Sequence, residues 1–260
     1  MVRGLADIGA EGVLLAGAGR AILLQLANPA IGRGIAAHSD FAARPLDRLR
    51  GTMTYVYAVV YGTDAQRAEV RRRVNRAHAP VRTAATASTP GYSAYDPDLQ
   101  LWVVATLYDT AVTVHERVYG PLDEDAADRV YSDYAAIGTA LQLPADQWPP
   151  DRSAFEDYFE AGLTRLSVDP AARKLAQDLL YPENGPGWLR FSMPLARFLT
   201  AGLLPPRVRE EFRLEWSNRR ERRFEVLMRM TAVVYPRLPE RMRHGFRNYC
   251  LTQLDAKATA

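Results

Sequence analysis

Histidine is the side chain best suited to binding metals and moving protons near neutral pH, and this chain of 260 residues contains four. His78 shares a predicted helical face with Val74 and Val81, so its imidazole points toward the core. A core-facing histidine is either a structural residue held by hydrogen bonds or a metal ligand, such as the proximal ligand of a haem iron. The spacing alone leaves both interpretations open.

Arg48 and Thr52 lie four residues apart and therefore share one face of a predicted helix, and Tyr55 and Val59 continue this stripe. An arginine beside a hydroxyl at the edge of an apolar cavity can bind a carboxylate, such as a haem propionate, or orient bound dioxygen. In the alternative interpretation, Arg48 pairs with an acid near Asp40, and Thr52 bonds to its own helix.

His115 continues a predicted apolar stripe through Tyr108 and Ala111. It is a candidate sixth iron ligand, a polar group lining a pocket, or a core histidine with a backbone partner, and the last interpretation is favoured. His38, in the sequence HSDF, is expected at a helix junction. His244, in an arginine-rich segment, is expected at the surface.

Several other kinds of site find no support. The chain has no HExxH motif, no paired histidine–carboxylate triad and no nucleophile elbow, which argues against zinc hydrolysis and acyl transfer. Cys250 is the only cysteine, so no intramolecular disulfide or CxxC site can form. Gly17 and Gly19 resemble a dinucleotide-binding turn, but Ile22 replaces the third glycine and the next segments are helical. Close approach of two helices is the favoured explanation.

The composition is that of an ordinary globular protein, with 48% hydrophobic and 24% charged residues. Its 33 basic residues are nearly balanced by 30 acidic ones, which argues against a nucleic-acid partner. Asp7, Glu11 and Arg20 interrupt the apolar residues near the N-terminus. We therefore expect no export signal, no transmembrane segment and a cytoplasmic location.

Apolar residues recur at helical spacing almost throughout, which predicts an all-α fold and one domain over residues 1–260. The charges of both signs in residues 207–229 favour a solvated helix with ion pairs, with an anionic membrane or cofactor surface as the alternative. The predicted helices span residues 10–27, 45–62, 64–87, 96–119, 123–141, 151–167, 169–181, 187–203, 205–235 and 237–255.

Five elements follow one another in a specific order: LLQLANP, HSDF, the Arg-xxx-Thr of residues 48–52, the lone His78 and DPDLQLWVVATL. Over residues 10–122 this succession resembles the catalytic domain family of the rubber oxygenase (latex-clearing protein) and the MpaB oxygenase. WLRFSMPLARFLTAGLLPPRVREEF shows a looser likeness. The resemblance implies a globin-like core, best matched over residues 1–122, with further helices packed on it over residues 123–260.

The same resemblance implies one b-type haem, with His78 as the proximal iron ligand and Arg48 and Thr52 as the distal pair. Two positions depart from the family pattern. Gly51 stands where the rubber oxygenase has a lysine that can close off the iron, and Val104 stands where relatives often have a histidine. The sixth iron position would then be open, water-bound, or filled by another group such as His115.

The sequence thus predicts a haem b-dependent oxygenase that uses dioxygen or peroxide to oxidise an apolar small molecule, namely an isoprenoid, a lipid or an aromatic natural product. Polyisoprene is not expected as the substrate without an export signal. One alternative is a non-catalytic haem protein, a sensor or electron carrier, in which His115 joins His78 on the iron. The other is a cofactor-free helical protein that binds an apolar ligand. A homodimer is compatible with the sequence.

Overall fold

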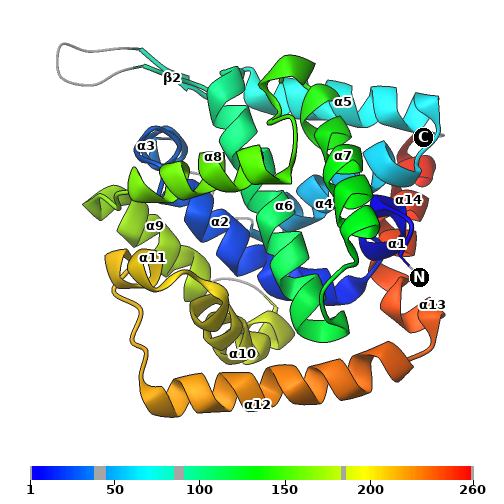
Figure 1. Ribbon diagram of the computed structural model, residues 1–260. Helices are drawn as coiled ribbons and strands as arrows, with labels where there is room; N and C mark the ends of the chain where they lie inside the picture. The colour runs from blue at the N-terminus through cyan, green and yellow to red at the C-terminus, as the bar shows by residue number, and fades with distance from the viewer. Residues whose placement is uncertain (1, 38–44, 85–90, 183–185, 259–260) are drawn as a thin grey trace.

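Helices make up most of the chain in this computed structural model, which describes residues 2–37, 45–84, 91–182 and 186–258 (Figure 1). The all-α fold predicted from the sequence is confirmed. The helices are α1 (Leu5–Ile8), η1 (Gly12–Gly17), α2 (Ala18–Leu26), α3 (Pro29–Ala36), α4 (Pro45–Tyr61), α5 (Asp64–His78), α6 (Pro97–Tyr119), α7 (Glu124–Thr139), η2 (Ala145–Gln147), α8 (Arg152–Thr164), α9 (Pro170–Leu180), α10 (Gly187–Leu203), α11 (Pro206–Glu211), α12 (Asn218–Val234), η3 (Tyr235–Arg237), α13 (Glu240–Arg243) and α14 (Gly245–Ala258); those labelled η are 3-10 helices.

A short antiparallel hairpin follows α5. Strand β1 (Arg82–Thr83) pairs with β2 (Tyr92–Ser93), with Arg82 opposite Ser93 and Thr83 opposite Tyr92. In Figure 1 this hairpin lies beside the start of α6, on the same side of the molecule as α3. It therefore returns the chain from the end of α5 to the centre of the fold.

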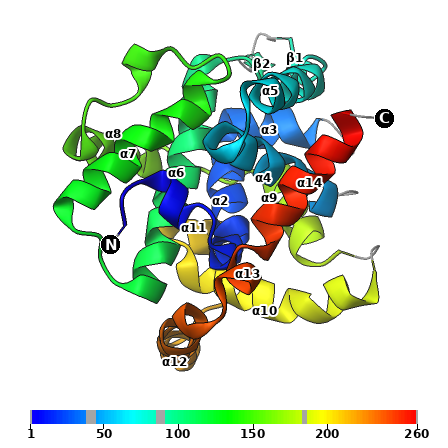
Figure 2. The same cartoon turned by 90° about the vertical axis from the view of Figure 1, so that its right-hand side faces the viewer.

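Helix α6 runs through the middle of the molecule, with α2 beside it (Figures 1 and 2). The Asp96 carboxylate caps α6 by accepting from the amides of Asp98 and Leu99, and Pro97 occupies the first helical position. One continuous apolar cluster surrounds α6 and includes residues as distant in sequence as Leu5 and Leu254. Helix α14 therefore shares this core with the N-terminal helices, whereas Phe224 and Met228 of α12 belong to a second, smaller cluster.

Two glycines near the N-terminus allow three helices to approach closely. A Cβ atom at Gly17 would overlap Thr110 of α6, and one at Gly19 would overlap Thr200 of α10. The close-packing explanation of Gly17 and Gly19 is thus confirmed. In the described part of the chain these residues lie among helices, and no βαβ unit surrounds them.

Arg20 forms a buried polar junction at the same place. Its Nε donates to the Leu203 carbonyl at 2.9 Å, Nη1 donates to Thr110 Oγ1 at 2.7 Å, and Nη2 pairs with Asp109 Oδ2 at 2.5 Å. Burial raises the pKa of Asp109, and the charge of Arg20 only partly offsets this effect. One guanidinium thus holds α2, α6 and α10 together.

One predicted helix ends earlier than expected, and another is divided in two. The helix predicted over 64–87 stops at His78, because Pro80 lacks the amide proton needed to continue the helical ladder. The helix predicted over 205–235 divides into α11 and α12, because the chain turns at Arg213, whose φ of 54° lies in the left-handed region.

The remaining helix boundaries differ at the two ends of the chain. The helix predicted over 10–27 begins as η1 and continues as α2, while α14 begins at Gly245, after α13. Helix α3 was not predicted. It begins because Asn28 Oδ1 accepts from the amides of Ala30 and Ile31, and Pro29 takes the first helical position.

No single helix within the described ranges is long and apolar enough to span a membrane. The pair Gly12–Leu26 and Pro29–Ala36 meets the criteria of length and composition only when taken together, and it is bent by 99°.

Candidate cofactor site at His78

His78 is the last residue of α5 and is half-buried. Its ring meets the ring of Tyr95 edge to face, with the centroids 6.4 Å apart and the planes at 70°. The His78 Nδ1 atom is buried and has no hydrogen-bond partner in the described part of the chain. A buried ring nitrogen without a partner can indicate ligand binding, but His115 Nδ1 is in the same state among the described residues, so this feature does not by itself distinguish His78.

The surroundings of His78 favour its neutral form. Burial lowers the pKa of the imidazole below its usual range, and the nearby charge of Arg48 lowers it further. A helix C-terminus would by itself favour the charged form, so these two effects outweigh the helix dipole. Neutral imidazole is the form that binds metal ions, and the lowered pKa keeps His78 in this form near neutral pH.

The first turns of α4 form an open face beside this histidine. Arg48, Gly51 and Thr52 are all exposed, and a Cβ atom at Gly51 would meet nothing within 4 Å. Arg48 keeps access to solvent, yet desolvation by the protein around it lowers its pKa, while nearby Tyr92 raises it. The structure therefore brings Arg48 near His78 and leaves the predicted Arg-xxx-Thr pair accessible.

Further along α4 the same stripe enters the core. Tyr55 is buried and its hydroxyl donates to the Ile137 carbonyl at 2.5 Å, and Val59 is also buried. Tyr55 is thus a structural residue rather than part of the open face. His38 and Asp40, the predicted junction residue and the proposed neighbour of Arg48, lie outside the described residues.

Two tyrosines of this site were missed from the sequence. Tyr95 packs on His78, and Tyr92, in strand β2, lies close enough to Arg48 for their charges to interact. Tyr92 lies in strand β2 of the hairpin that follows α5, and Tyr95 comes directly after this strand. Their position depends on this hairpin, whose first strand, β1, lies in a segment predicted to be helical.

His115 lies in a different place. It is buried and stacks on Tyr119, with the centroids 5.0 Å apart and the planes at 24°. His78 contacts Tyr95, just before the start of α6, whereas His115 lies 18 residues beyond Pro97, or about 27 Å along the helix axis. The structure therefore does not bring His115 to the iron position suggested by His78.

The neighbours of His115 form a cluster of polar residues. The Tyr119 hydroxyl donates to Glu11 Oε2 at 2.7 Å, and Arg243 Nη1 pairs with Glu11 Oε1. His244 Nε2 lies 3.1 Å from Glu11 Oε1, so His244 is mostly buried and not at the surface as predicted. Burial lowers the pKa of His115, and the charge of Glu11 offsets part of this effect.

We expect the substitution Arg48→Met to raise the pKa of His78, because it removes a positive charge that opposes protonation. An NMR titration of the histidine ring protons in the cofactor-free protein measures this shift. His115 is the internal control, because Glu11 rather than Arg48 acts on its pKa. An unchanged His78 pKa in the variant would contradict the proximity of the two side chains.

The sign of the pH effect on stability follows from the same shift. The pKa of His78 is lowered on folding from its usual 6.5. Between the pKa of the folded chain and 6.5, the unfolded chain therefore binds more protons than the folded one. Stability therefore rises as pH increases through this window. Arg48→Met should make the slope of unfolding free energy against pH shallower, as measured by chemical denaturation.

Glycine-to-alanine substitutions at two helical positions should have opposite effects. A Cβ atom at Gly34 of α3 would overlap the Tyr92 ring, so Gly34→Ala is expected to lower the free energy of unfolding by about 1–3 kcal/mol. At Gly51 the added methyl meets no atom, and alanine should stabilise α4 by about 0.5–1 kcal/mol. Chemical denaturation of both variants checks this contrast, and equal effects would contradict it.

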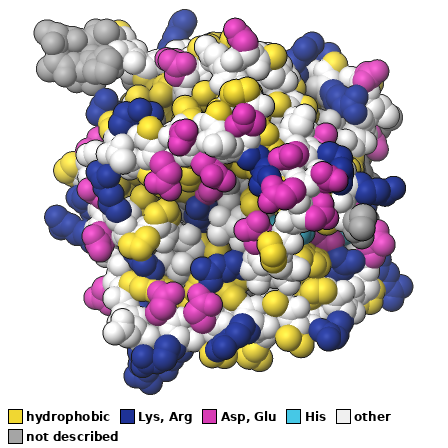
Figure 3. Space-filling view, viewed as in Figure 1, with side chains coloured by type: hydrophobic (Ala, Val, Ile, Leu, Met, Phe, Trp, Pro, Cys, Tyr) yellow, Lys and Arg dark blue, Asp and Glu magenta, His cyan; other side chains and the backbone are white. Residues whose placement is uncertain are grey.

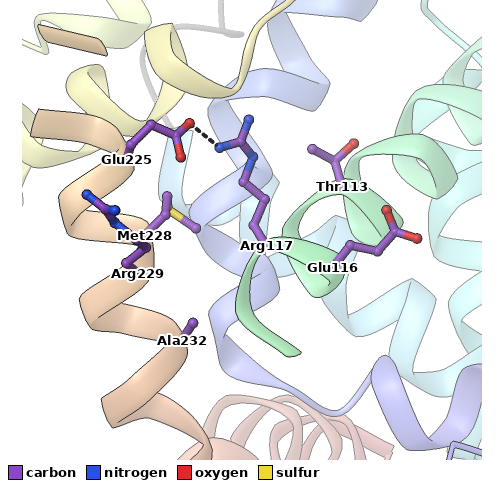
Figure 4. A pocket seen from close by; sticks show the side chains of 7 residues that line it. All are labelled: Thr113, Glu116, Arg117, Glu225, Met228, Arg229 and Ala232. Atoms are coloured by element: carbon purple, nitrogen blue, oxygen red, sulfur yellow. Dashed lines mark hydrogen bonds and ion pairs between the residues drawn. The ribbon is translucent and has the colours of Figure 1, made fainter. Parts of the chain in front are cut away.

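A cavity of about 410 Å³ lies elsewhere, between α6 and α12 (Figure 4). Arg117 of α6 and Glu225 of α12 point toward one another beside it and form an ion pair at 2.6 Å. Its lining residues are Thr113, Glu116, Arg117, Glu225, Met228, Arg229 and Ala232. None of the predicted site residues takes part in this cavity.

The chain belongs to the family described as ER-bound oxygenase mpaB/B'/Rubber oxygenase, catalytic domain, which matches residues 6–233. The resemblance found in the sequence is thereby confirmed, and the family places this chain among oxygenase-type oxidoreductases. Similar proteins include one uncharacterized protein of Mycobacterium bovis and one of Mycobacterium tuberculosis. Each is 39% identical over 226 residues, which cover 85% of this chain and 88% of the relative. No solved structure matches the chain significantly.

Proposed function

We propose that this protein is a b-type haem-dependent oxygenase that oxidises an apolar small molecule with dioxygen or peroxide. The observation that carries this proposal is the placement of His78, an imidazole that burial keeps neutral, near the charge of Arg48 and the exposed first turns of α4. The match to an oxygenase family over most of the chain supplies the reaction class.

The residues around His78 fit a haem. Histidine is a common proximal ligand of haem iron, and here the imidazole is held uncharged. The exposed guanidinium of Arg48 suits a propionate carboxylate or bound dioxygen. The open surface at Gly51 and Thr52 offers room for a flat cofactor beside α4.

Each side chain has a separate part in this proposal. His78 would hold the iron, and Tyr95 packs on the imidazole and restricts its orientation. Arg48 neutralises negative charge on the cofactor or on oxygen, and Thr52 offers a hydroxyl one helical turn away. Haem, when bound, would supply the activation of dioxygen, while the protein would supply the ligand and the polar groups that orient the reactants.

Gly51 has no side chain that could bind iron, so the family's closing lysine has no equivalent at this position. His115 lies too far along α6 to take that place. We therefore propose that neither residue would keep dioxygen from a haem held by His78. Because the family includes a rubber oxygenase, we propose an apolar substrate, with isoprenoids, lipids and aromatic natural products as the classes to test.

A haem titration of the cofactor-free protein tests the proposal. We expect one haem per chain, a Soret band that carbon monoxide shifts in the reduced protein, and oxygen uptake with at least one class of apolar substrate. Failure to retain haem would instead favour a cofactor-free apolar-ligand binder. A six-coordinate spectrum that carbon monoxide does not change would favour a sensor or electron carrier.

A further inference from the structure

Helix α12 forms an outer edge of the molecule, and both ribbon views place it there (Figures 1 and 2). Its inner face is firmly attached. Phe224 and Met228 are buried in a cluster with residues of α6 and α10, and Arg117 of α6 lies over the Phe224 ring at 5.1 Å. The side chains on the opposite face have no such neighbours. Internal packing therefore does not explain which residue types occur there.

The outer face carries an exposed apolar stripe. Val226, Met230, Val233 and Val234 are spaced three and four residues apart and therefore share one side of the helix. Between 46% and 60% of each side chain is exposed. Scattered exposed apolar residues are ordinary, but four on one helical face form a contiguous patch. Figure 3 shows hydrophobic and basic side chains together along this edge.

Four arginines adjoin the same stripe, namely Arg219, Arg222, Arg223 and Arg229, and all four are exposed. In the described part of the chain none of them forms an ion pair, although ion pairs are numerous elsewhere. The two acids of α12 are engaged on its other sides: Glu225 pairs with Arg117, and Glu221 accepts from the Trp216 indole. The outer face is therefore apolar and cationic, with no acidic residue.

We propose that the outer face of α12 docks onto an anionic lipid bilayer surface. A helix lying in the interface places its apolar side chains among the lipid chains, while its arginines meet the phosphate-bearing headgroups. Residues 207–229 were predicted to form a solvated helix with ion pairs. The outer face of α12, which includes part of this segment, would in addition bind the membrane. This inference uses no residue of the haem site and stands independently of the proposed function.

Two other occupants fit this face less well. A nucleic acid would take the arginines but would leave the apolar stripe without a partner. A second copy of the chain, related by a twofold axis, would bring this cationic face against an identical cationic face. An anionic membrane accepts both features at once.

Vesicle co-sedimentation tests the proposal with the full chain. We expect binding to vesicles of phosphatidylcholine mixed with phosphatidylglycerol, weaker binding at high salt, and none to phosphatidylcholine alone. Arg219→Glu combined with Arg222→Glu should lower partitioning at least about 20-fold. Met230→Ser combined with Val233→Ser keeps the charge and should also weaken binding.

A charge-matched control separates a specific face from net charge. Arg71 and Arg165 are exposed on other parts of the surface, and Arg71→Glu combined with Arg165→Glu changes the net charge by the same amount. This control should retain binding, with circular dichroism showing that all variants are folded. Three results would overturn the proposal: no binding to anionic vesicles, an equal loss in the control, or dimerisation in solution that Met230→Ser and Val233→Ser abolish.

Discussion

Replacing His78 with glycine is expected to weaken haem binding by at least about 100-fold, because it removes the proposed iron ligand. Residues that only support a metal ligand typically contribute 10- to 100-fold, so the ligand itself should contribute at least as much. His78 is the last residue of α5, where glycine should cost no more than about 1 kcal/mol, so the variant should remain folded. The Soret band during haem titration measures the loss.

Free imidazole provides the decisive second measurement for this variant. Because glycine leaves a space where the ring was, added imidazole should restore the Soret band and the carbon monoxide complex. The matched variant His115→Gln changes the other core-facing histidine, which lies about 27 Å along α6 from Pro97, and should bind haem as the wild type does. Unchanged haem binding in His78→Gly, or its loss in His115→Gln alone, would remove His78 from the site.

Long periodic elements with strong capping residues could be predicted from the sequence. The helix predicted over 96–119 agrees within one residue with α6, because Asp96 and Pro97 combine with an uninterrupted apolar stripe. Asn28 and Pro29 are the same kind of signal, but the helix they begin is only eight residues long. Short helices offer too few periods to be distinguished from a loop by pattern alone.

The candidate site was predictable only in part, since its members are distant in sequence. The sequence predicted that His78 shares an apolar helical face with Val74 and Val81, but α5 ends at His78, so Val81 lies outside this helix. The proximity of His78 to Arg48 depends on the packing of α4 against α5. Tyr92 and Tyr95 reach Arg48 and His78 only because of the β1–β2 hairpin, which was not predicted. Similarly, His244 appeared to be a surface residue because its partner Glu11 lies 233 positions away.

Truncating Arg20 to alanine should be among the most damaging substitutions to stability, with an expected loss of about 3–5 kcal/mol in the free energy of unfolding. The change leaves Asp109 without its cation and removes the donors to Thr110 Oγ1 and the Leu203 carbonyl. All these groups are at the junction of α2, α6 and α10, where little water can replace the guanidinium. Chemical denaturation of the cofactor-free protein measures the effect.

Two comparisons separate the buried charge from the lost packing. Arg20→Met combined with Asp109→Leu removes both charges and should cost less than Arg20→Ala alone, because no unpaired carboxylate remains. Lys174→Ala breaks an exposed ion pair with Asp178 and should cost less than about 1 kcal/mol. A loss for Arg20→Ala no larger than that for Lys174→Ala would contradict the structural role of the junction.

The pH dependence of the Arg20→Ala variant provides a further check with a definite sign. Burial already raises the pKa of Asp109 above its usual 3.8 in the presence of Arg20, and removing the cation should raise it further. The folded variant then binds more protons than its unfolded state at mildly acidic pH, so its stability falls as pH rises. The deficit relative to the wild type should therefore shrink on acidification, and a deficit that grows would exclude Asp109 as its cause.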